Sequence, residues 1–327
     1  MATESTADPS HRRGDLRERP ILLVGSASRH LAVAVENETG LRRGASTAER
    51  FPDGEVSVQL EEPVRGHEVI LLAATSPPVN DHLVELLAMA DACRRADAAR
   101  IVAVIPYFGY ARSDRRDGRR TPIMTRLVAE LTELAGIDHV ITIDAHTPAL
   151  EGFFRVPVDN LTAVPLLASA LQRQPPLDAV IVAPDLGAVR LANRYATLLD
   201  LPVAVCHKQR FGGTEVRVAR VTGDVSGRRC ILIDDMITTG ATIVEAARAI
   251  ADAGALAHPT VSATHGVFAP GSLERLEAAG IEEVFVTDTI APAQPDGRLV
   301  PHVVSAASLI STAVHRLLEG GSLRDLS

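Results

Sequence analysis

Aromatic residues are scarce in this sequence, and this scarcity limits what its core can be. Aromatic residues make up 3% of the 327 residues and Trp is absent, yet 46% of the chain is hydrophobic. A core with so few aromatic side chains must be aliphatic, as in the Val-, Ile- and Leu-rich strands of parallel sheets. A chain of this length is long for one domain and sufficient for two.

Cysteine is also rare, and its pattern excludes two further classes of protein. The three cysteines, Cys93, Cys206 and Cys230, are odd in number and far apart in the sequence. They therefore form neither a disulfide framework nor a metal-binding motif. Reduced thiols are typical of cytoplasmic proteins, so we expect a cytoplasmic location.

The sequence has neither an excess of positive charge nor a long apolar run. Its formal net charge of −8 argues against a nucleic-acid partner. No apolar run approaches the length of a membrane span, so we expect no membrane partner. Residues 1–19 are polar and charged and contain no apolar signal core, which predicts a flexible tail.

Apolar runs typical of strands alternate with helical patterns along the rest of the chain. The predicted strands are 21–24, 69–73, 101–105, 140–143, 180–182, 203–206, 230–233, 261–264 and 284–286. The predicted helices are 83–94, 123–135, 161–171, 189–199, 243–253, 273–279 and 306–318. This alternation predicts an α/β fold with mainly parallel sheets flanked by helices. Because both halves of the chain show the same alternation of strands and helices, we predict two similar domains, with a boundary near residues 157–160.

The stretch ILIDDMITTGATI, residues 231–243, is the most informative in the chain. An apolar strand is followed by Asp234 and Asp235, then by a hydroxyl-rich turn and a helix. The backbone N–H groups and positive end of such a helix attract phosphate. The carboxylates repel phosphate but accept hydrogen bonds from ribose hydroxyls. A plain strand-to-helix turn is the alternative, although two adjacent buried aspartates would be costly there. The stretch therefore predicts a sugar-phosphate site.

Polar side chains follow several other predicted strands. They include the arginine-rich loop 106–116, Asp144 and His146 on one strand face, Asp185, and the segment from Lys208 to Arg210. Ligands of open parallel sheets bind beyond the carboxyl ends of the strands. Taken singly, Asp185 could cap a helix and Lys208 could begin a hairpin. Together, basic groups for phosphate and His or Asp ligands for a hard cation predict a nucleotide-phosphate site.

Taken together, six segments resemble the ribose-phosphate pyrophosphokinase (phosphoribosyl-pyrophosphate synthetase) family. They are FPDGEVSVQL (51–60), VNDHLVELLAMADACRRADAARI (79–101), VIPYFGYARSDRR (104–116), GFFRVPVDN (152–160), APDLGAVR (183–190) and ILIDDMITTGAT (231–242). The resemblance covers residues 20–318. It implies two phosphoribosyltransferase-like domains, 20–160 and 161–303, with the active site between them and a C-terminal helix, 304–320, packing back on the first.

The resemblance also implies an activity and its requirements. The enzyme would transfer the pyrophosphoryl group of ATP to the 1-hydroxyl of ribose 5-phosphate, giving phosphoribosyl pyrophosphate and AMP. Mg²⁺ would be the cofactor, and the chain would form a homo-oligomer, a hexamer in this family. A non-catalytic member that regulates or scaffolds an active synthetase is the second hypothesis. A single-domain phosphoribosyltransferase ranks third, because it would leave half the chain unexplained.

Residue roles are carried over by position from the resemblance. ATP would be bound by Phe51, which stacks on adenine, by Asp53 and Glu55 from a neighbouring subunit, and by Arg112, Asp117 and His146. The metal would meet His146 and Asp185, and the catalytic loop would supply Lys208 and Arg210. Ribose 5-phosphate would be bound by Asp234, Asp235, Thr238, Thr239, Gly240, Ala241 and Thr242.

Three segments of the sequence depart from the pattern of the family. Ser113 replaces a Gln that can reach a base edge, which bears on the preference for adenine. Ala241 replaces a Gly in the phosphate loop, which requires a negative φ at that residue. Pro148, Ala149 and Leu150 follow the site histidine where the family carries polar side chains of a regulatory nucleotide or phosphate site. We therefore expect altered regulation rather than lost activity.

Overall fold

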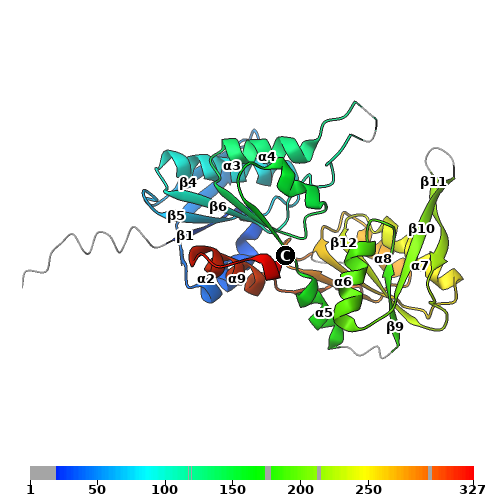
Figure 1. Cartoon of the computed structure of the whole chain (residues 1–327). Coiled ribbons are helices and arrows are strands. Elements are labelled where there is room, and N and C mark those ends of the chain that lie inside the picture. Colours follow the sequence, from blue (N-terminus) through cyan, green and yellow to red (C-terminus); the bar gives the residue numbers. More distant parts are fainter. Residues whose placement is uncertain (1–19, 117, 119, 174–177, 212–214, 294–296) are drawn as a thin grey trace, which may run out of the picture. The chain divides into compact units, whose positions relative to one another are not determined.

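The computed structural model describes residues 20–116, 118, 120–173, 178–211, 215–293 and 297–327. It divides into two compact units, each considered by itself (Figure 1). The first contains the chain up to Asn160 and Ile310–Asp325, and the second contains Leu161–Leu309 and the last two residues. The change of unit falls inside the short strand β8 (Val158–Leu161).

The first unit is built on a mainly parallel sheet. In the described residues its strand order is β2-β1-β5-β6-β7-β8, with β1 Ile21–Val24, β2 Arg42–Arg43, β5 Glu68–Leu72, β6 Arg100–Ile105 and β7 His139–Ile143. Helices α3 (Val79–Arg95) and α4 (Met124–Leu134) cover one face, while α2 (Arg29–Thr39) and α9 (Ala307–Leu318) lie on the other (Figure 1). Alternate strand residues such as Leu23 and Leu71 pack in the core with α3 and α4, as the period of two requires.

A two-stranded hairpin, β3 (Ser46–Arg50) and β4 (Val56–Leu60), adds to this unit and was not predicted. Its residues are mostly half-buried or exposed, so they lack the apolar run that marks a core strand. The described part of this unit also contains three short 3₁₀ helices: η1 (Ser26–Ser28), η2 (Pro148–Phe153) and η3 (Arg324–Leu326). The last residue of η3 belongs to the second unit.

The second unit repeats the architecture. The strand order of its described residues is β11-β10-β9-β12-β13-β14-β15. The strands are β9 Ala179–Ala183, β10 Val203–Phe211, β11 Glu215–Thr222, β12 Arg229–Ile237, β13 Thr260–Gly266, β14 Glu283–Thr287 and β15 His302–Val304. The helices are α5 Val164–Gln172, α6 Val189–Leu199, α7 Ala241–Asp252 and α8 Ser272–Ala278. Only β10 and β11 pair antiparallel among these, so the predicted α/β fold with mainly parallel sheets is confirmed.

Two aliphatic layers fill the second unit, one on each face of its sheet. Ile181 and Ile231 pack with α5 and α6, whereas Val182 and Leu232 pack with α7 and α8. Neighbouring residues of a strand thus serve opposite faces, and nearly all of them are apolar because both faces are covered. All three cysteines are buried, and none of them forms a disulfide bond. None of the helices in the described part of the chain is both long and apolar enough to span a bilayer.

Two predicted boundaries are wrong for the same reason. Residue 304, expected to begin the C-terminal helix, ends β15, whose Val304 pairs with Thr287 of β14. Strand β12, expected to stop before Asp234, continues to Ile237, because Met236 and Ile237 pair with His265 and Gly266 of β13. In both cases the boundary is set by pairing with a distant strand, which local sequence does not report: the expected helix is shortened and β12 is extended.

Candidate active site

The turn between β12 and α7 has the geometry of an anion cradle. Gly240 precedes the helix with a φ of 74°, a left-handed conformation that favours glycine. A Cβ there would also lie 3.1 Å from the Leu276 side chain. Ala241 is the first helical residue and does not have a positive φ, so its Cβ is tolerated where the family has Gly. The twelve-residue α7 starts directly after Thr238–Gly240, so the N–H groups of its first turn, which have no partner within the helix, lie at this turn.

Asp234 and Asp235 lie at the end of β12 next to this turn, and both are partly buried. Burial, reinforced by the carboxylates of Asp235 and Asp185, raises the pKa of Asp234 well above its usual range. The backbone N–H of Asp235 donates to Asp234 Oδ1 at 2.9 Å. A cluster of carboxylates this close is stabilised by ligands that donate hydrogen bonds or carry positive charge.

Asp185 belongs to this acidic cluster and also has a structural role. It follows β9, and its Oδ1 accepts hydrogen bonds from the N–H groups of Gly187 at 3.0 Å and Ala188 at 3.3 Å, just before α6. These bonds close the turn that precedes α6, but the N-cap of that helix is Ala188, whose side chain makes no capping hydrogen bond, so Asp185 is not the helix cap that its position suggested. Within the described residues, no three His, Cys, Asp or Glu side chains converge tightly enough to hold a metal ion by themselves. Mg²⁺ commonly binds through one or two carboxylates together with water and substrate phosphates, which fits this donor set.

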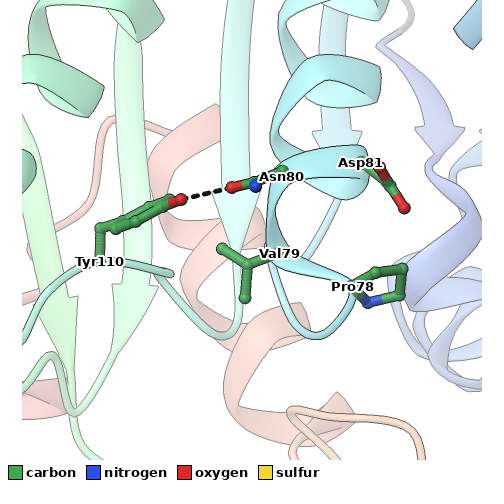
Figure 2. A pocket seen from close by; sticks show the side chains of 5 residues that line it. All are labelled: Pro78, Val79, Asn80, Asp81 and Tyr110. Carbon is green, nitrogen blue, oxygen red and sulfur yellow. Dashed lines mark hydrogen bonds between the residues drawn. The ribbon is translucent and has the colours of Figure 1, made fainter. Parts of the chain in front are cut away.

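The first unit has an open pocket of 470 Å³ at the start of α3. It is lined by Pro78, Val79, Asn80, Asp81 and Tyr110. Figure 2 shows Tyr110 extending from the arginine-rich loop to Asn80, where its hydroxyl donates to Asn80 Oδ1. Tyr110 has a φ of 66°, an uncommon backbone conformation for a bulky residue. The pocket thus joins the start of α3 to the loop expected to bind ATP.

The hairpin carrying Phe51, Asp53 and Glu55 is attached to the same helix start. Arg50, at the base of its tip, forms an ion pair with Asp81 at 2.6 Å. The tip closes through Phe51 N–H donating to Glu55 O at 2.8 Å and Glu55 N–H donating to Asp53 Oδ1 at 3.1 Å. Phe51 is 50% exposed, which is unusual for a large aromatic side chain. The tip therefore presents an aromatic face and two carboxylates to solvent.

The arginine-rich loop is closed by backbone and hydroxyl contacts. Gly109 N–H donates to Thr75 Oγ1 at 2.6 Å, and a Cβ on Gly109 would lie 2.7 Å from Thr75 O. Ser113 Oγ accepts from the first N–H of α4, that of Met124, at 3.4 Å. Ser113 thus contributes to the start of helix α4. Arg112 is exposed, and Asp117 lies outside the described residues.

His146 lies beyond the end of β7, and the prediction that it shares a strand face with Asp144 is wrong. The strand ends at Ile143, and Asp144 has a φ of 38°, so the alternation of side chains stops there. His146 is exposed, and the N–H of the preceding residue, Ala145, donates to Asn160 Oδ1 at 3.0 Å. A left-handed residue other than glycine is costly, and such strain concentrates at functional sites.

Lys208 and Arg210 were expected just after a strand, and this placement is also wrong. Their backbone belongs to β10, which runs past its parallel partner β9 and pairs antiparallel with β11. The pairing shifts register between His207 and Lys208. The side chains of Lys208 and Arg210 lie outside the described part of the structure, so their expected roles stay predictions.

Comparison with known proteins decides the family. Residues 21–136 match the N-terminal domain of ribose phosphate pyrophosphokinase, and residues 213–327 match the phosphoribosyl synthetase-associated domain. Ribose-phosphate pyrophosphokinase 1 of Streptococcus pyogenes serotype M1 is 42% identical over 311 residues, which cover 93% of this chain and 96% of that protein. The chain belongs to the ribose-phosphate pyrophosphokinase family. The corresponding protein of Gloeobacter violaceus is 42% identical over 328 residues, 100% of this chain and 98% of its own.

A solved member of the ribose-phosphate pyrophosphokinase family shares the fold. Phosphoribosylpyrophosphate synthetase from Mycobacterium smegmatis matches with a TM-score of 0.86 and 37% identity, over 93% of this chain and all of that one, 100%. Against this family background, Asn80 and Asp81 stand out as pocket residues that sequence reasoning missed. Their one local signal is a helix start directly after Pro77 and Pro78, with Asp81 in the first turn.

Proposed function

We propose that this family member transfers the pyrophosphoryl group of ATP to the 1-hydroxyl of ribose 5-phosphate, releasing AMP. The observation that carries the proposal is the pairing of an acidic cluster with an anion cradle at the start of α7. Asp234 and Asp235 accept hydrogen bonds from ribose hydroxyls, and the turn from Thr238 to Thr242 binds the 5-phosphate. A ligand that carries hydroxyls and a phosphate matches both.

ATP is bound by the groups of the first unit. Phe51 stacks on adenine, Asp53 and Glu55 contact the base, and Arg112, Asp117 and His146 contact the nucleotide. The exposed aromatic tip and the pocket beside Tyr110 support this assignment. The 1-hydroxyl oxygen attacks the β-phosphorus, the bond from that phosphorus to the α-phosphate breaks, and AMP leaves. The hydroxyl proton passes to solvent.

Phosphoryl-type transfer needs positioning and charge neutralisation more than covalent help. Lys208 and Arg210 supply cations near the transferred group. Lys208 is the only lysine of the chain, because every other residue in the total of 33 Lys and Arg is arginine. Every other cationic side chain of this kind is a guanidinium, and only position 208 carries an ammonium group. This supports a specific requirement for an ammonium group at Lys208.

Mg²⁺ is the proposed cofactor, and His146 and Asp185 are the proposed positions that meet its sites together with phosphate oxygens. When bound, it neutralises charge on the ATP phosphates. The carboxylate oxygens around Asp185 are the hard ligands that Mg²⁺ prefers. The proposal includes a homo-oligomer in which Phe51, Asp53 and Glu55 serve a neighbouring subunit, as in a hexamer. It also includes a cytoplasmic location, where ATP and sugar phosphates are found.

A coupled assay tests the proposed function. Purified protein is mixed with ATP, ribose 5-phosphate and Mg²⁺, and AMP and phosphoribosyl pyrophosphate are measured together. We expect equal amounts of both products and no turnover in excess EDTA. Protein that binds both substrates yet releases no AMP above background would instead be a non-catalytic member of the family. AMP without phosphoribosyl pyrophosphate would contradict the assignment of the acceptor.

A further inference from the structure

A segment of the second unit, residues 268–275, is hydrogen-bonded to the back of the turn between β12 and α7. Three successive carbonyl oxygens of the turn accept one bond each from it. Phe268 N–H donates to Ile237 O at 3.0 Å, Ala269 N–H donates to Thr238 O at 2.9 Å, and Arg275 Nη1 donates to Thr239 O at 2.5 Å. We call residues 268–275 the backing segment.

These three bonds determine where the N–H groups of the turn point. In a planar trans peptide the C=O and N–H bonds point in opposite directions. Because the carbonyls of Ile237, Thr238 and Thr239 face the backing segment, the N–H groups of the next residues are directed away from it. Successive N–H groups on one side of the backbone form a concave site for an anion, which continues into the start of α7.

The third bond differs from the other two because a side chain makes it. Phe268 and Ala269 use backbone N–H groups, so no substitution other than proline removes their bonds. The Thr239–Gly240 peptide, nearest to α7, is held by the guanidinium of Arg275 on α8. Ala241 N–H reaches only 3.5 Å from Thr239 Oγ1, longer than an ordinary hydrogen bond, so a ligand oxygen can replace that contact.

We propose that Arg275 is a positioning residue that orients the Thr239–Gly240 peptide for the phosphate of the sugar substrate. The proposal rests on the proposed function of this turn. Arg275 touches the back of the turn and acts on the ligand through the peptide it holds. A charged donor also polarises that peptide, which strengthens the N–H of Gly240 as a donor on the opposite side.

The test compares three variants of the full-length protein. Arg275→Ala removes the bond, Arg275→Lys keeps a charged donor, and Arg248→Ala removes an exposed arginine of α7 as a matched control. Calorimetric Kd values for ribose 5-phosphate are measured with KM values for both substrates. For Arg275→Ala we expect a Kd about tenfold higher, from the loss of one charge-assisted bond. The KM for ATP should stay within about twofold, since the bond lies outside the ATP site.

The conservative variant separates positioning from general stability. Arg275→Lys should recover much of the affinity, because an ammonium group can donate to the same carbonyl. Arg248→Ala should bind ribose 5-phosphate as the wild type does. If Arg275→Ala fails to fold, the Lys variant and Arg275→Gln, an uncharged donor, carry the comparison. Wild-type affinity in Arg275→Ala, or equal weakening in Arg248→Ala, would overturn the proposal.

Failure of the proposed function gives a different result. If the wild type does not bind ribose 5-phosphate, the assigned substrate is wrong whatever Arg275 does. Inorganic phosphate is then the probe for the turn, measured on the wild type and Arg275→Ala. Weaker phosphate binding in the variant would still support the role of Arg275, and equal or absent phosphate binding in both would refute it.

Discussion

At the scale of single residues, the charged form of Asp234 lowers the stability of the folded protein, and the proposed role of this residue in substrate binding explains why it is kept. Its pKa is raised by burial and by the neighbouring carboxylates of Asp235 and Asp185, so the folded protein favours its protonated form. Between the unfolded and the folded pKa, the folded state binds more protons than the unfolded state. Stability from this group is therefore lost as pH rises through the folded pKa. Above that pH, the folded protein carries the full cost of the charge.

Asp234→Asn should be more stable and bind substrate less well. Without metal and substrate, at a pH above the raised pKa of Asp234, we expect the Tm to rise by about 2–4 °C for each kcal/mol of charge repulsion that the substitution removes. The gain should shrink as pH falls through the raised pKa, where wild-type Asp234 is already neutral. Affinity for ribose 5-phosphate should fall, because an amide accepts hydroxyl donors less strongly than a carboxylate. Thermal scans in EDTA across pH, with calorimetry, check both. A variant that is less stable than the wild type at the highest pH of the scan would contradict this account.

Lys208 gives a second prediction at this scale. Lys208→Ala should lower kcat by about 10²–10³-fold with little change in KM, as expected of a cation that acts mainly on the transition state. Lys208→Arg should keep part of the activity. Because no other lysine exists, an amine-acetylating reagent should inactivate the wild type and spare the residual activity of Lys208→Arg. Steady-state kinetics measure all three. An unchanged kcat in Lys208→Ala would remove this residue from the mechanism.

At the scale of elements, close approach of the chain holds the arginine-rich loop in place. Gly109 lies against Thr75 and Val79, and a Cβ would come within 2.7 Å of both. Gly109→Ala should cost about 1–3 kcal/mol of unfolding free energy, typical of overpacking. It should also raise the KM for ATP by displacing the loop. Gly152→Ala is the matched control, since a Cβ there meets nothing within 4 Å. Denaturant unfolding and steady-state kinetics compare the two variants. If Gly109→Ala changes neither the free energy of unfolding nor the KM for ATP, the loop can shift to accept a Cβ and this account is wrong.

The element η2 bears on regulation. Pro148 begins this 3₁₀ helix, Leu150 is fully buried in the core of the first unit, and Glu151 is exposed. Proline lacks an N–H donor, and Glu151 adds a charge that repels a diphosphate. We therefore expect ADP to inhibit only by competing with ATP. Inhibition kinetics with ATP raised to saturation test this. Sigmoidal inhibition that persists at saturating ATP would show that a separate regulatory site is retained.

At the scale of the whole molecule, the proposed adenine site requires a second subunit. Phe51 is exposed at the hairpin tip, where it can serve a neighbouring copy. The Lys208→Ala and Phe51→Ala variants, each of low activity alone, should regain activity when they are mixed into hybrid oligomers. In a hybrid, the Lys208→Ala subunit supplies an unchanged Phe51, and the Phe51→Ala subunit supplies an unchanged Lys208 to the same shared site. Each variant re-mixed with itself is the control. Sedimentation at the assay concentration should show an oligomer. A fully active monomer, or no gain on mixing, would contradict the shared site.

The sequence by itself determined the α/β class and the elements with strong local signals. Continuous apolar runs such as Ile231–Ile233 mark strands covered on both faces, and the helix after Gly240 follows from its own pattern. The acidic pair and hydroxyl-rich turn are likewise contiguous in the chain. Their chemistry could therefore be inferred before their geometry.

Tertiary structure alone decided features that join distant parts of the chain. The extension of β12 depends on β13, the approach of Arg50 to Asp81 joins hairpin and helix, and the bond from Arg275 to Thr239 spans 36 residues. Asp144 has a φ of 38°, so the strand conformation ends before this residue. No local sequence pattern around an Asp specifies such a φ. Hydrogen bonds and ion pairs between remote residues have no period in the sequence. They exist only after the sheets have formed and brought their partners together.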